Sequence, residues 1–420
     1  MVLDFKVKDP ALREEGVKAI RWAESRMPVL MEVKREFTRE RPLKDVRVGA
    51  CLHVTKETGA LMRTLKAGGA EVALCGSNPL STQDPVAAAL AREDVKVYAW
   101  RGQTAEEYYE CIRLTLEQDP MVTLDDGADL VTTLHREGGG RLNAVYGGTE
   151  ETTTGVIRLR ALSTQGVLKY PIIAVNDAQS KSLFDNPLGT GQSALDGVIR
   201  ATNILIAGKE VVVAGYGRVG SGIAERAKGL GAKVTVVECD PIKALKAAMS
   251  GYRVTCMDEA ASYGDLFITA TGDVNVIRGR HFQAMKDGAI LANAGHFDVE
   301  ISKPELKSIS LKVERVSPCV EAYTLKDGRR LYLLAEGRLV NLACGEGHPS
   351  DVMDLSFALQ ALSVRYIVEN RGRLPVGVLE VPAEIDRRVA CLKLSTMGVK
   401  LEALTDEQRR YLSSWELGTV

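Results

Sequence analysis

The sequence predicts an α/β protein with two parallel-sheet units, and two observations carry this prediction. Apolar strand patterns alternate with helical patterns over residues 1–185, and the alternation returns over about 190–340. A glycine-rich loop follows the first strand of the second unit, as it does in nucleotide-binding sheets. The 420 residues suffice for two or three domains, and 45% hydrophobic and 26% charged residues are typical of a globular protein.

The first unit begins with an amphipathic helix, which we expect from Gly16 to Phe37. Strands are expected at 46–54 and 70–76, with a helix that ends in glycines at 57–69 between them. Further buried strands are expected within three later stretches, 120–130, 143–155 and 170–186. Because ligands bind at the carboxyl ends of strands in open α/β sheets, polar residues at these ends are candidate site residues.

The second unit supplies five more expected strands: 210–215, 233–239, 253–257, 265–272 and 289–295. A long helical pattern follows at 337–370. The last segment, 381–420, is helical and charged and carries Tyr411 and Trp415. A segment of this kind is typical of a tail that docks on another subunit.

Composition excludes several classes of protein. The net charge is −1 without a basic block, which argues against nucleic acid or an anionic membrane as a partner. The first ten residues are too charged for a signal peptide, and no apolar run is long enough to span a bilayer. The eight cysteines are scattered without a C-x-x-C pair, so we expect reduced thiols, a cytoplasmic location and no metal site.

The loop after the strand at 210–215 is a complete G-x-G-x-x-G motif. Gly215 permits the tight turn, Gly217 lets the backbone approach a pyrophosphate, and Gly220 allows close helix packing. The pyrophosphate is expected at the start of the helix that begins near Val219. Glu238 ends the next strand, where an acid binds the ribose diol. The alternative, a glycine-rich turn without a ligand, is disfavoured because strand, helix and acid are all in register.

Glu238 also selects the cofactor, because its carboxylate repels a 2′-phosphate. NAD is therefore preferred over NADP, although Lys243 and Arg218 are nearby cations that weaken the preference.

Each polar cluster at a strand end also has an ordinary structural explanation. His53 alone could be a core histidine, and Asp125 and Asp126 could form a turn. Lys181 and Asp185 have the spacing of a surface helix pair. The threonines after Glu151 could cap a helix, and His296 and His348 could be structural. The clusters taken together favour a ligand-binding site, because all these carboxylate clusters are expected at the carboxyl ends of strands.

Five long motifs resemble those of the S-adenosylhomocysteine hydrolase family. They are GSNPLSTQDPVAAAL (76–90), LDDGADL (124–130), EETTTG (150–155), NAGHFDVEI (293–301) and AEGRLVNLACGEGHPS (335–350). The resemblance covers nearly the whole chain, from the first helix to about residue 400. It implies a Rossmann-type NAD domain (186–345) inserted in a split α/β substrate-binding domain (1–185 and 346–380), with a helical C-terminal tail (381–420). It also implies a homotetramer in the methionine cycle of one-carbon metabolism.

The activity implied by this resemblance is the reversible hydrolysis of S-adenosylhomocysteine to adenosine and homocysteine. The 3′-hydroxyl is oxidised with bound NAD, which makes the C4′ proton acidic. Homocysteine then leaves by β-elimination, water adds to the enone, and the ketone is reduced again. The resemblance thereby explains why the dinucleotide fingerprint lies in mid-chain, because the NAD domain is inserted in the substrate-binding domain. The oxidation is temporary, within a net hydrolysis.

The resemblance also assigns roles to individual residues. Lys181 takes the 3′-hydroxyl proton, its pKa lowered by burial and neighbours, and Asn186 positions it. Asp126 is the base at C4′, and His53 assists at the leaving sulfur and the entering water. The remaining substrate contacts are Asp185 and Glu151 at the ribose hydroxyls, Thr55 and Glu57 at the adenine, and His348 closing over the site.

Cofactor contacts are implied in the same way. His296 and Asn341 lie near the reacting 3′ oxygen and the nicotinamide carboxamide. The other residues expected at NAD are Thr152, Thr153, Thr154, Gly215, Gly217, Arg218, Val219, Gly220, Ser221, Gly222, Glu238, Lys243, Ala294, Gly295 and His348.

The chain departs from the family pattern at several places. Thr190 stands where a cysteine is common, and Glu346 stands where an apolar residue is usual near the purine. Arg218, Ser221 and Lys243 are also unusual around the cofactor. The chain ends in SSWELGTV and lacks the Lys/Tyr-bearing tail that reaches a neighbouring subunit's NAD in many members.

Three other activities remain open from the sequence. An S-inosylhomocysteine hydrolase would differ only in its purine, which Glu57 as a hydrogen-bond acceptor disfavours. A 2-hydroxyacid dehydrogenase would need an arginine for the substrate carboxylate and a His–Glu pair. A non-catalytic NAD-binding regulator of the same fold would carry a Ser-rich N-terminal extension, whereas this sequence starts at the first expected helix.

Overall fold

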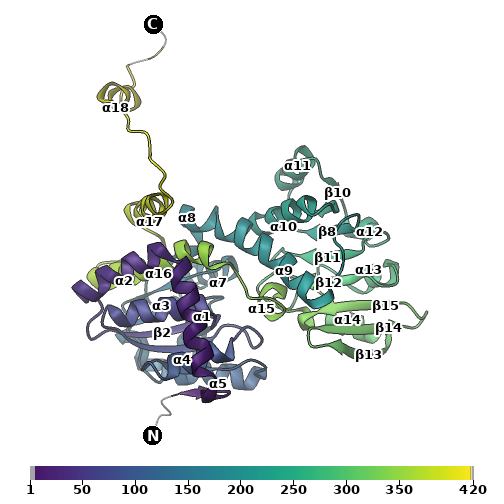
Figure 1. The fold of residues 1–420 in the computed structure, drawn as a ribbon, viewed down its shortest axis with the longest axis horizontal. Coiled ribbons are helices and arrows are strands. Elements are labelled where there is room, and N and C mark those ends of the chain that lie inside the picture. Colours follow the sequence, from purple (N-terminus) through teal and green to yellow (C-terminus); the bar gives the residue numbers. More distant parts are fainter. Residues whose placement is uncertain (1–4, 417, 419–420) are drawn as a thin grey trace.

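The structure is a computed structural model that describes residues 5–416 and residue 418. It contains two eight-stranded sheets that lie side by side, each with helices on both faces (Figure 1). Beyond residue 396, the C-terminal segment stands away from both units. No helix among the described residues is long and apolar enough to cross a membrane.

The first sheet is entirely parallel. Its spatial order is β1 (Lys6–Val7), β4 (Lys96–Ala99), β3 (Glu71–Gly76), β2 (Arg47–Leu52), β5 (Val122–Asp125), β6 (Gly147–Glu150), β7 (Ile172–Ala174) and β16 (Val378–Glu380). Strand β16 comes from the far end of the chain and pairs with β7, so the whole second sheet is inserted within the first unit. This confirms the predicted split α/β architecture.

Helices cover both faces of the first sheet. They are α1 (Arg13–Arg26), α2 (Pro28–Glu40), α3 (Lys56–Ala67), α4 (Asp84–Ala91), α5 (Ala105–Leu116), α6 (Asp129–Glu137), α7 (Thr153–Thr164), α16 (Ser350–Glu369) and α17 (Ala383–Thr396). One apolar core packs α1 to α4 and α16 on one face, and a second packs α5 to α7 on the other. The single helix expected from Gly16 to Phe37 is two helices, because Pro28 cannot donate the hydrogen bond that would continue α1.

The second sheet has the spatial order β10 (Arg253–Thr255), β9 (Lys233–Val237), β8 (Glu210–Ala214), β11 (Leu266–Thr269), β12 (Ile290–Asn293), β15 (Arg330–Leu334), β14 (Val320–Leu325) and β13 (Ser310–Ser317). The first six strands are parallel, and β15, β14 and β13 form an antiparallel extension. The sequence predicted the five strands from β8 to β12 but not this extension. Its helices are α9 (Gly191–Thr202), α10 (Arg218–Gly229), α11 (Pro241–Met249), α12 (Met257–Ala260), α13 (Gly279–Ala284) and α14 (Lys303–Ser308).

Two segments connect the units (Figure 1). The outgoing segment contains α8 (Gln179–Ser182) and a π-helical turn at Asp185–Thr190, and the returning segment contains α15 (Val340–Ala343). Beyond α17, the tail carries α18 (Asp406–Ser413) and several exposed apolar side chains, of which Trp415 is 92% exposed.

Candidate active site

Both sheets have the same doubly wound order over six parallel strands. The order β4-β3-β2-β5-β6-β7 in the first unit matches β10-β9-β8-β11-β12-β15 in the second. In this topology ligands bind at the carboxyl edge, where the strand order reverses. The reversal lies between β2 and β5 in the first unit, where His53 and Asp126 follow the strands. In the second unit it lies between β8 and β11, where the glycine loop follows β8.

One pocket collects residues from both carboxyl edges and from the two connecting segments. Its lining includes these predicted site residues: His53, Thr55, Glu57, Asp126, Glu151, Thr152, Lys181, Asp185, Asn186, Val219, Ala294, His296, Asn341 and His348. These side chains are spread over some three hundred positions of sequence, so only the fold brings them together.

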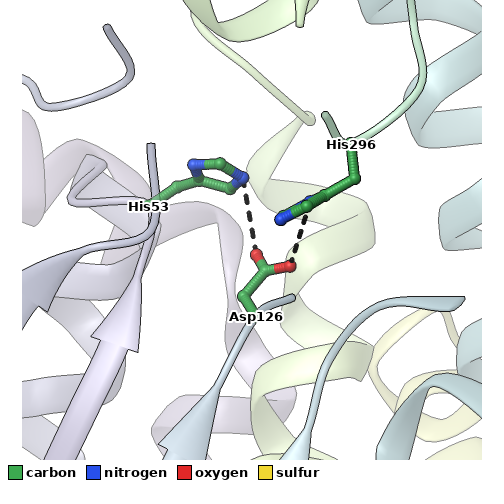
Figure 2. Close-up of side chains that lie close together, drawn as sticks. All are labelled: His53, Asp126 and His296. Atoms are coloured by element: carbon green, nitrogen blue, oxygen red, sulfur yellow. Dashed lines mark ion pairs between the residues drawn. The ribbon is translucent and has the colours of Figure 1, made fainter. Parts of the chain in front are cut away.

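Asp126 lies between two histidines (Figure 2). Its carboxylate oxygens are 3.5 Å from Nε2 of His53 and 3.7 Å from Nδ1 of His296. The Nδ1–H of His53 donates to Oγ of Ser81 at 2.8 Å, since that hydroxyl donates to the carbonyl of Asn78. Burial lowers the pKa of His53 to about 4, against the opposing effect of Asp126. His53 is therefore a neutral imidazole at neutral pH, with Nε2 free to take up a proton.

These three side chains offer nitrogen and oxygen atoms within 4.8 Å of one another, which is also close enough to hold a metal ion. The sequence predicted no metal site, and that expectation stays a prediction. A buried carboxylate between two imidazoles is equally suited to moving protons.

Lys181 has a hydrogen-bond acceptor for each of its three N–H groups. Nζ is 2.7 Å from Oδ2 of Asp185, 3.1 Å from Oδ1 of Asn186 and 3.3 Å from Oδ1 of Asn176. Burial lowers the pKa of Lys181, but the charges of Asp185 and Glu151 outweigh burial and raise it overall. The prediction of a lowered pKa was therefore wrong for the protein by itself, because a buried ammonium with this many acceptors keeps its proton.

Asp185 also binds His348 on the returning segment. Its Oδ1 accepts from Nδ1 of His348, and Nε2 of that ring lies 2.9 Å from Oγ1 of Thr190. Burial disfavours the charged forms of both groups, yet their mutual attraction lowers the pKa of Asp185 and raises that of His348. The hydroxyl of Thr190, where the family often has a cysteine, thus completes a hydrogen-bonded link between the two connecting segments.

Glu151 is oriented by a glutamine that the sequence did not single out. Nε2 of Gln360, on α16, donates to Oε2 of Glu151 at 2.6 Å. The hydroxyl of Thr149 in turn donates to Oε1 of Gln360, which holds the amide in place. Burial raises the pKa of Glu151 to about 7, although Lys181 and Gln360 act in the opposite direction. Glu151 therefore changes charge near neutral pH.

Thr55 and Glu57 lie at the start of α3. The Thr55 hydroxyl caps the helix by accepting from the backbone of Thr58. Glu57 is 1% exposed, accepts a hydrogen bond from Oγ of Ser350, and has Nζ of Lys56 3.4 Å from its Oε1. Glu57 is thus more than a helix cap, since its carboxylate faces the pocket beside a cation. Glu346 lies outside this lining and pairs with Lys56 at 3.1 Å.

The glycine loop has the geometry that a dinucleotide needs. Gly215 has φ +95°, and a Cβ on Gly220 would lie 1.9 Å from the carbonyl oxygen of Gly215. A Cβ on Gly217 would meet nothing within 4 Å, so this position is open for a ligand. Glu238 accepts the backbone N–H of Tyr216 at 2.7 Å, which ties the loop to the end of β9.

A second feature also fits NAD. Asn341 is buried, its Nδ2 donates to Oγ of Ser193, and its Oδ1 has no partner among the described residues. An unpaired buried carbonyl in the pocket is a ready acceptor for a carboxamide N–H.

The other predicted cofactor residues lie outside the pocket lining. The hydroxyl of Thr153 donates to Asn176, and that of Ser221 donates to the carbonyl of Arg218. Gly222 is explained by helix packing, since a Cβ there would lie 2.0 Å from the carbonyl oxygen of Pro187. Also outside the lining are Thr154, Arg218, Lys243 and Gly295.

Sequence reasoning missed the apolar wall of the pocket, which consists of Leu52, Leu339, Leu342, Met353 and Phe357. These residues carry no signal that separates a pocket wall from a protein core. Asn176 and Gln360 were missed as well, because a buried amide beside a carboxylate or lysine is recognised only from contacts.

The fold and the site together define a class of protein. A dinucleotide-binding sheet faces a second sheet that carries titratable side chains, and both contribute to one buried pocket. This is the arrangement of a two-domain nucleotide-dependent enzyme.

Comparison with known proteins identifies the family. Residues 4–144 match the model of S-adenosyl-L-homocysteine hydrolase, and residues 186–347 match the model of its NAD-binding domain. An adenosylhomocysteinase of Aquifex aeolicus is 58% identical over 99% of this chain and 100% of its own length. One of Sulfurisphaera tokodaii is also 58% identical, over the same shares of the two chains. The chain belongs to the S-adenosyl-L-homocysteine hydrolase family, and its cofactor is NAD.

One relative is named for a different activity. The S-inosyl-L-homocysteine hydrolase of Methanopyrus kandleri is 57% identical over 99% of this chain and 98% of its own length. Overall identity therefore does not separate the two purines, and the choice depends on residues in the pocket.

Proposed function

We propose that this enzyme reversibly hydrolyses S-adenosylhomocysteine to adenosine and homocysteine. The observation that carries the proposal is the single pocket in which Lys181 and Asp185 lie together with His53 and Asp126. The first pair suits chemistry at ribose hydroxyls, and the second suits proton transfer at C4′ and C5′. A simple dehydrogenase needs only one of these two sets.

The thioether at C5′ is a poor leaving group until the sugar is activated. Bound NAD supplies the hydride acceptor for C3′ and the donor for its return. A 3′-ketone makes the C4′ proton acidic, so that a base can remove it while the C5′–S bond breaks. Homocysteine leaves with a proton on sulfur, water adds at C5′, C4′ regains a proton, and C3′ is reduced again.

Lys181 and its acceptors act on the 3′ oxygen. The hydroxyl proton must leave as C3′ is oxidised, and Nζ of Lys181 receives it only after losing a proton of its own. Glu151 lies 3.8 Å from Nζ, and burial raises its pKa to about 7, so it is suited to accept that proton. Asp185 and Glu151 supply acceptor oxygens for the ribose hydroxyls, and Asn186 holds Lys181 in place.

Asp126 and His53 act on the elimination. Asp126 removes the C4′ proton, and His53, neutral at neutral pH, exchanges a proton with the leaving sulfur and the entering water. His296 is on the opposite side of Asp126 and comes from the NAD-binding sheet, so it joins the two halves of the site (Figure 2).

Glu57 favours adenine over hypoxanthine. Its carboxylate accepts hydrogen bonds and suits the 6-amino group of adenine, whereas the 6-carbonyl of hypoxanthine would place two acceptors face to face. The ammonium group of Lys56 and the hydroxyl of Ser350 both lie against this carboxylate. A site built around one hydrogen bond rejects a mismatch by up to roughly ten-thousand-fold.

Thiol release from adenosyl- and inosylhomocysteine tests this proposal directly. We expect the wild type to prefer the adenosyl substrate, and Glu57→Gln to lose most of that preference, because an amide can also donate. Faster turnover of the inosyl substrate by the wild type would overturn the purine assignment. An unchanged preference in Glu57→Gln would remove Glu57 from purine recognition.

The two remaining alternatives lack support in the pocket. Its lining, among the described residues, contains no arginine that could hold the carboxylate of a 2-hydroxyacid. A non-catalytic regulator would have no need of His53, Asp126 and Lys181 together in a buried site.

We further propose a cytoplasmic homotetramer that acts in the methionine cycle. All eight cysteines, each of them described, are free thiols, which suits a reducing compartment. Exposed apolar side chains on the tail suit contact with another subunit. The domain boundaries we propose are 1–185 and 346–380 for substrate, 186–345 for NAD, and 381–420 for the tail.

A further inference from the structure

The last residue of β5 and the last residue of β6 are acids, and a second acid directly follows each of them. Only the second acid of each pair lines the pocket. These second acids are Asp126 and Glu151. The first acids, Asp125 and Glu150, are fully buried and lie opposite each other in the register of the two strands. The mechanism above leaves these two buried carboxyl groups unused.

Asp125 has an ordinary structural role. Its Oδ2 accepts the backbone N–H of Val131 at 2.8 Å, in the first turn of α6, and its Oδ1 accepts that of Asp126 at 3.0 Å. It therefore caps the helix that follows its own strand.

Glu150 does something different, because it joins two loops. Its Oε1 accepts the backbone N–H of Gly127 at 2.9 Å and that of Thr152 at 3.0 Å. Gly127 directly follows Asp126, and Thr152 directly follows Glu151. A single carboxyl oxygen thus holds together the two chain segments that present the pocket carboxylates.

The surrounding backbone is shaped around this carboxyl group. A Cβ on Gly155, in the first turn of α7, would lie 2.2 Å from Cδ of Glu150. Gly127 has φ +107°, and a Cβ there would lie 2.2 Å from Nε2 of His296. The hydrogen bond from Gly127 to Glu150 therefore also sets how closely the loop of Asp126 approaches His296.

Glu150 is held in its uncharged form. Burial raises its pKa well above the usual range, and the charges of Asp125 and Asp126 act in the same direction. Arg158 on the packed helix α7 is bound to Asp129 and to the carbonyl of Gly127. Oε2 of Glu150 has no hydrogen-bond partner among the described residues.

We propose that Glu150 is a positioning residue whose carboxyl oxygen fixes the spacing of Asp126 and Glu151 through the backbone of the residues that follow them. The proposal rests on the proposed function, because it is the hydrolysis that uses Asp126 and Glu151 together. Glu150 touches neither substrate nor cofactor. It acts only through the two loops.

Two substitutions of Glu150 separate its acceptor oxygen from its charge. Glu150→Gln keeps an acceptor at the same place and is neutral at every pH. We expect thiol release within about threefold of the wild type and an unchanged pH profile of kcat. Glu150→Leu removes the acceptor and leaves two backbone N–H groups unpaired. A misplacement of about 1 Å typically costs on the order of a hundredfold, so we expect a loss of that order in kcat with NAD content unchanged.

Asp354→Asn is the matched control. Asp354 is a fully buried carboxyl group in the same unit that accepts the backbone N–H of Leu30 and pairs with Lys393, outside the pocket lining. We expect this variant to lower the melting temperature while the pH profile of kcat stays that of the wild type.

Wild-type thiol release from adenosylhomocysteine tests the proposed function, and the ratio of variant to wild type tests Glu150. Normal kcat in a folded Glu150→Leu would overturn the proposal, since the residue would then be merely structural. A Glu150→Gln variant that loses activity, or in which the acidic limb of the pH profile of kcat moves, would also overturn the proposal, because the Glu150 carboxyl group would then act as a charge. The Gln result decides the matter even if the Leu variant does not fold.

Discussion

The two sheets share one strand order but use their carboxyl edges in different ways. At the reversal of the first sheet stand the side chains of His53 and Asp126. At the reversal of the second stands the glycine loop, in which a Cβ on Gly217 would meet nothing within 4 Å and Val219 lines the pocket. The same topology therefore serves substrate chemistry through side chains and cofactor binding through backbone.

The carboxyl edges of the two sheets also share one feature, a buried glutamate that accepts hydrogen bonds from the backbone of loops. Glu300, in the loop after β12, is fully buried like Glu150, and it accepts the backbone N–H groups of Thr271 and Gly272 after β11. A Cβ on Gly295 would lie 1.7 Å from its Oε1, as a Cβ on Gly155 would meet Glu150. In both units a buried glutamate packed against a glycine accepts hydrogen bonds from loop N–H groups at the carboxyl edge of the sheet.

The largest effect is expected at the substrate edge, from Asp126→Asn. Removing a general base typically lowers the rate by about a hundred- to ten-thousand-fold. Because Asp126 is the base that we propose for C4′, the variant should still oxidise C3′, so reduced nicotinamide should accumulate while homocysteine release nearly stops. Absorbance of the bound cofactor and a thiol assay follow the two steps separately.

Two outcomes would change the role of Asp126. A variant that forms no reduced cofactor would place Asp126 at the oxidation step. Normal turnover would reduce it to a turn residue and would erase the contrast between the two edges.

At the carboxyl edge of the second sheet, substitutions of two glycines distinguish an effect on NAD binding from an effect on stability. Gly217→Ala adds a methyl group where the protein leaves open space, so the melting temperature of the NAD-free protein should stay the same. Its NAD affinity should fall at least about tenfold, which corresponds to about 1.4 kcal/mol. Gly220→Ala would place its Cβ against the carbonyl of Gly215, so it should lower stability as well.

NAD titration and thermal unfolding of the two variants give the comparison. The wild type should carry NAD through purification, because the reaction consumes none. Unaltered NAD affinity in Gly217→Ala would show that the backbone of this loop does not approach the cofactor.

A smaller effect is expected from Gln360→Leu, which alters the charge of Glu151 without touching the substrate. The glutamine donates to the ionised carboxylate, so its loss disfavours the charged form and raises the pKa of Glu151 above about 7. A hydrogen bond to a charged group contributes about 1.5 kcal/mol, or about one pH unit. The acidic limb of kcat/KM should therefore move up by about one unit.

Ser363→Ala is the control for this shift, since Ser363 is buried on the same helix and its hydroxyl has no partner among the described residues. An acidic limb that stays in place in Gln360→Leu would mean that the limb does not report Glu151.

Local patterns were sufficient to predict five strands of each sheet and the glycine loop, but not β1, β4 and β16 in the first sheet. Strand, glycine and acid have a fixed spacing around Gly215 and Glu238, so the sequence alone carries the signal. Strand β13 was missed because most of its residues are exposed, which leaves no apolar alternation to detect. The helix break before Pro28 could have been predicted from the sequence, because proline is common at the first position of a helix.

Electrostatics at the site was less predictable. The raised pKa of Lys181 depends on how many acceptors surround Nζ, and one of them, Asn176, lies in the helical turn directly after β7, where no motif marks it. Gln360 lies among apolar residues of α16, so its contact with Glu151 has no counterpart in the sequence pattern. Burial and charge compete at each of these groups, and only the folded geometry decides the sign.

Hydrolysis of adenosylhomocysteine in deuterated water is the most direct test of a temporary oxidation at C3′ that makes C4′ acidic. We expect adenosine that carries deuterium at C4′ and retains its original hydrogen at C3′, as nuclear magnetic resonance of the product would show. Adenosine without deuterium at C4′ would contradict the proposed elimination, because homocysteine would then have left without loss of that proton.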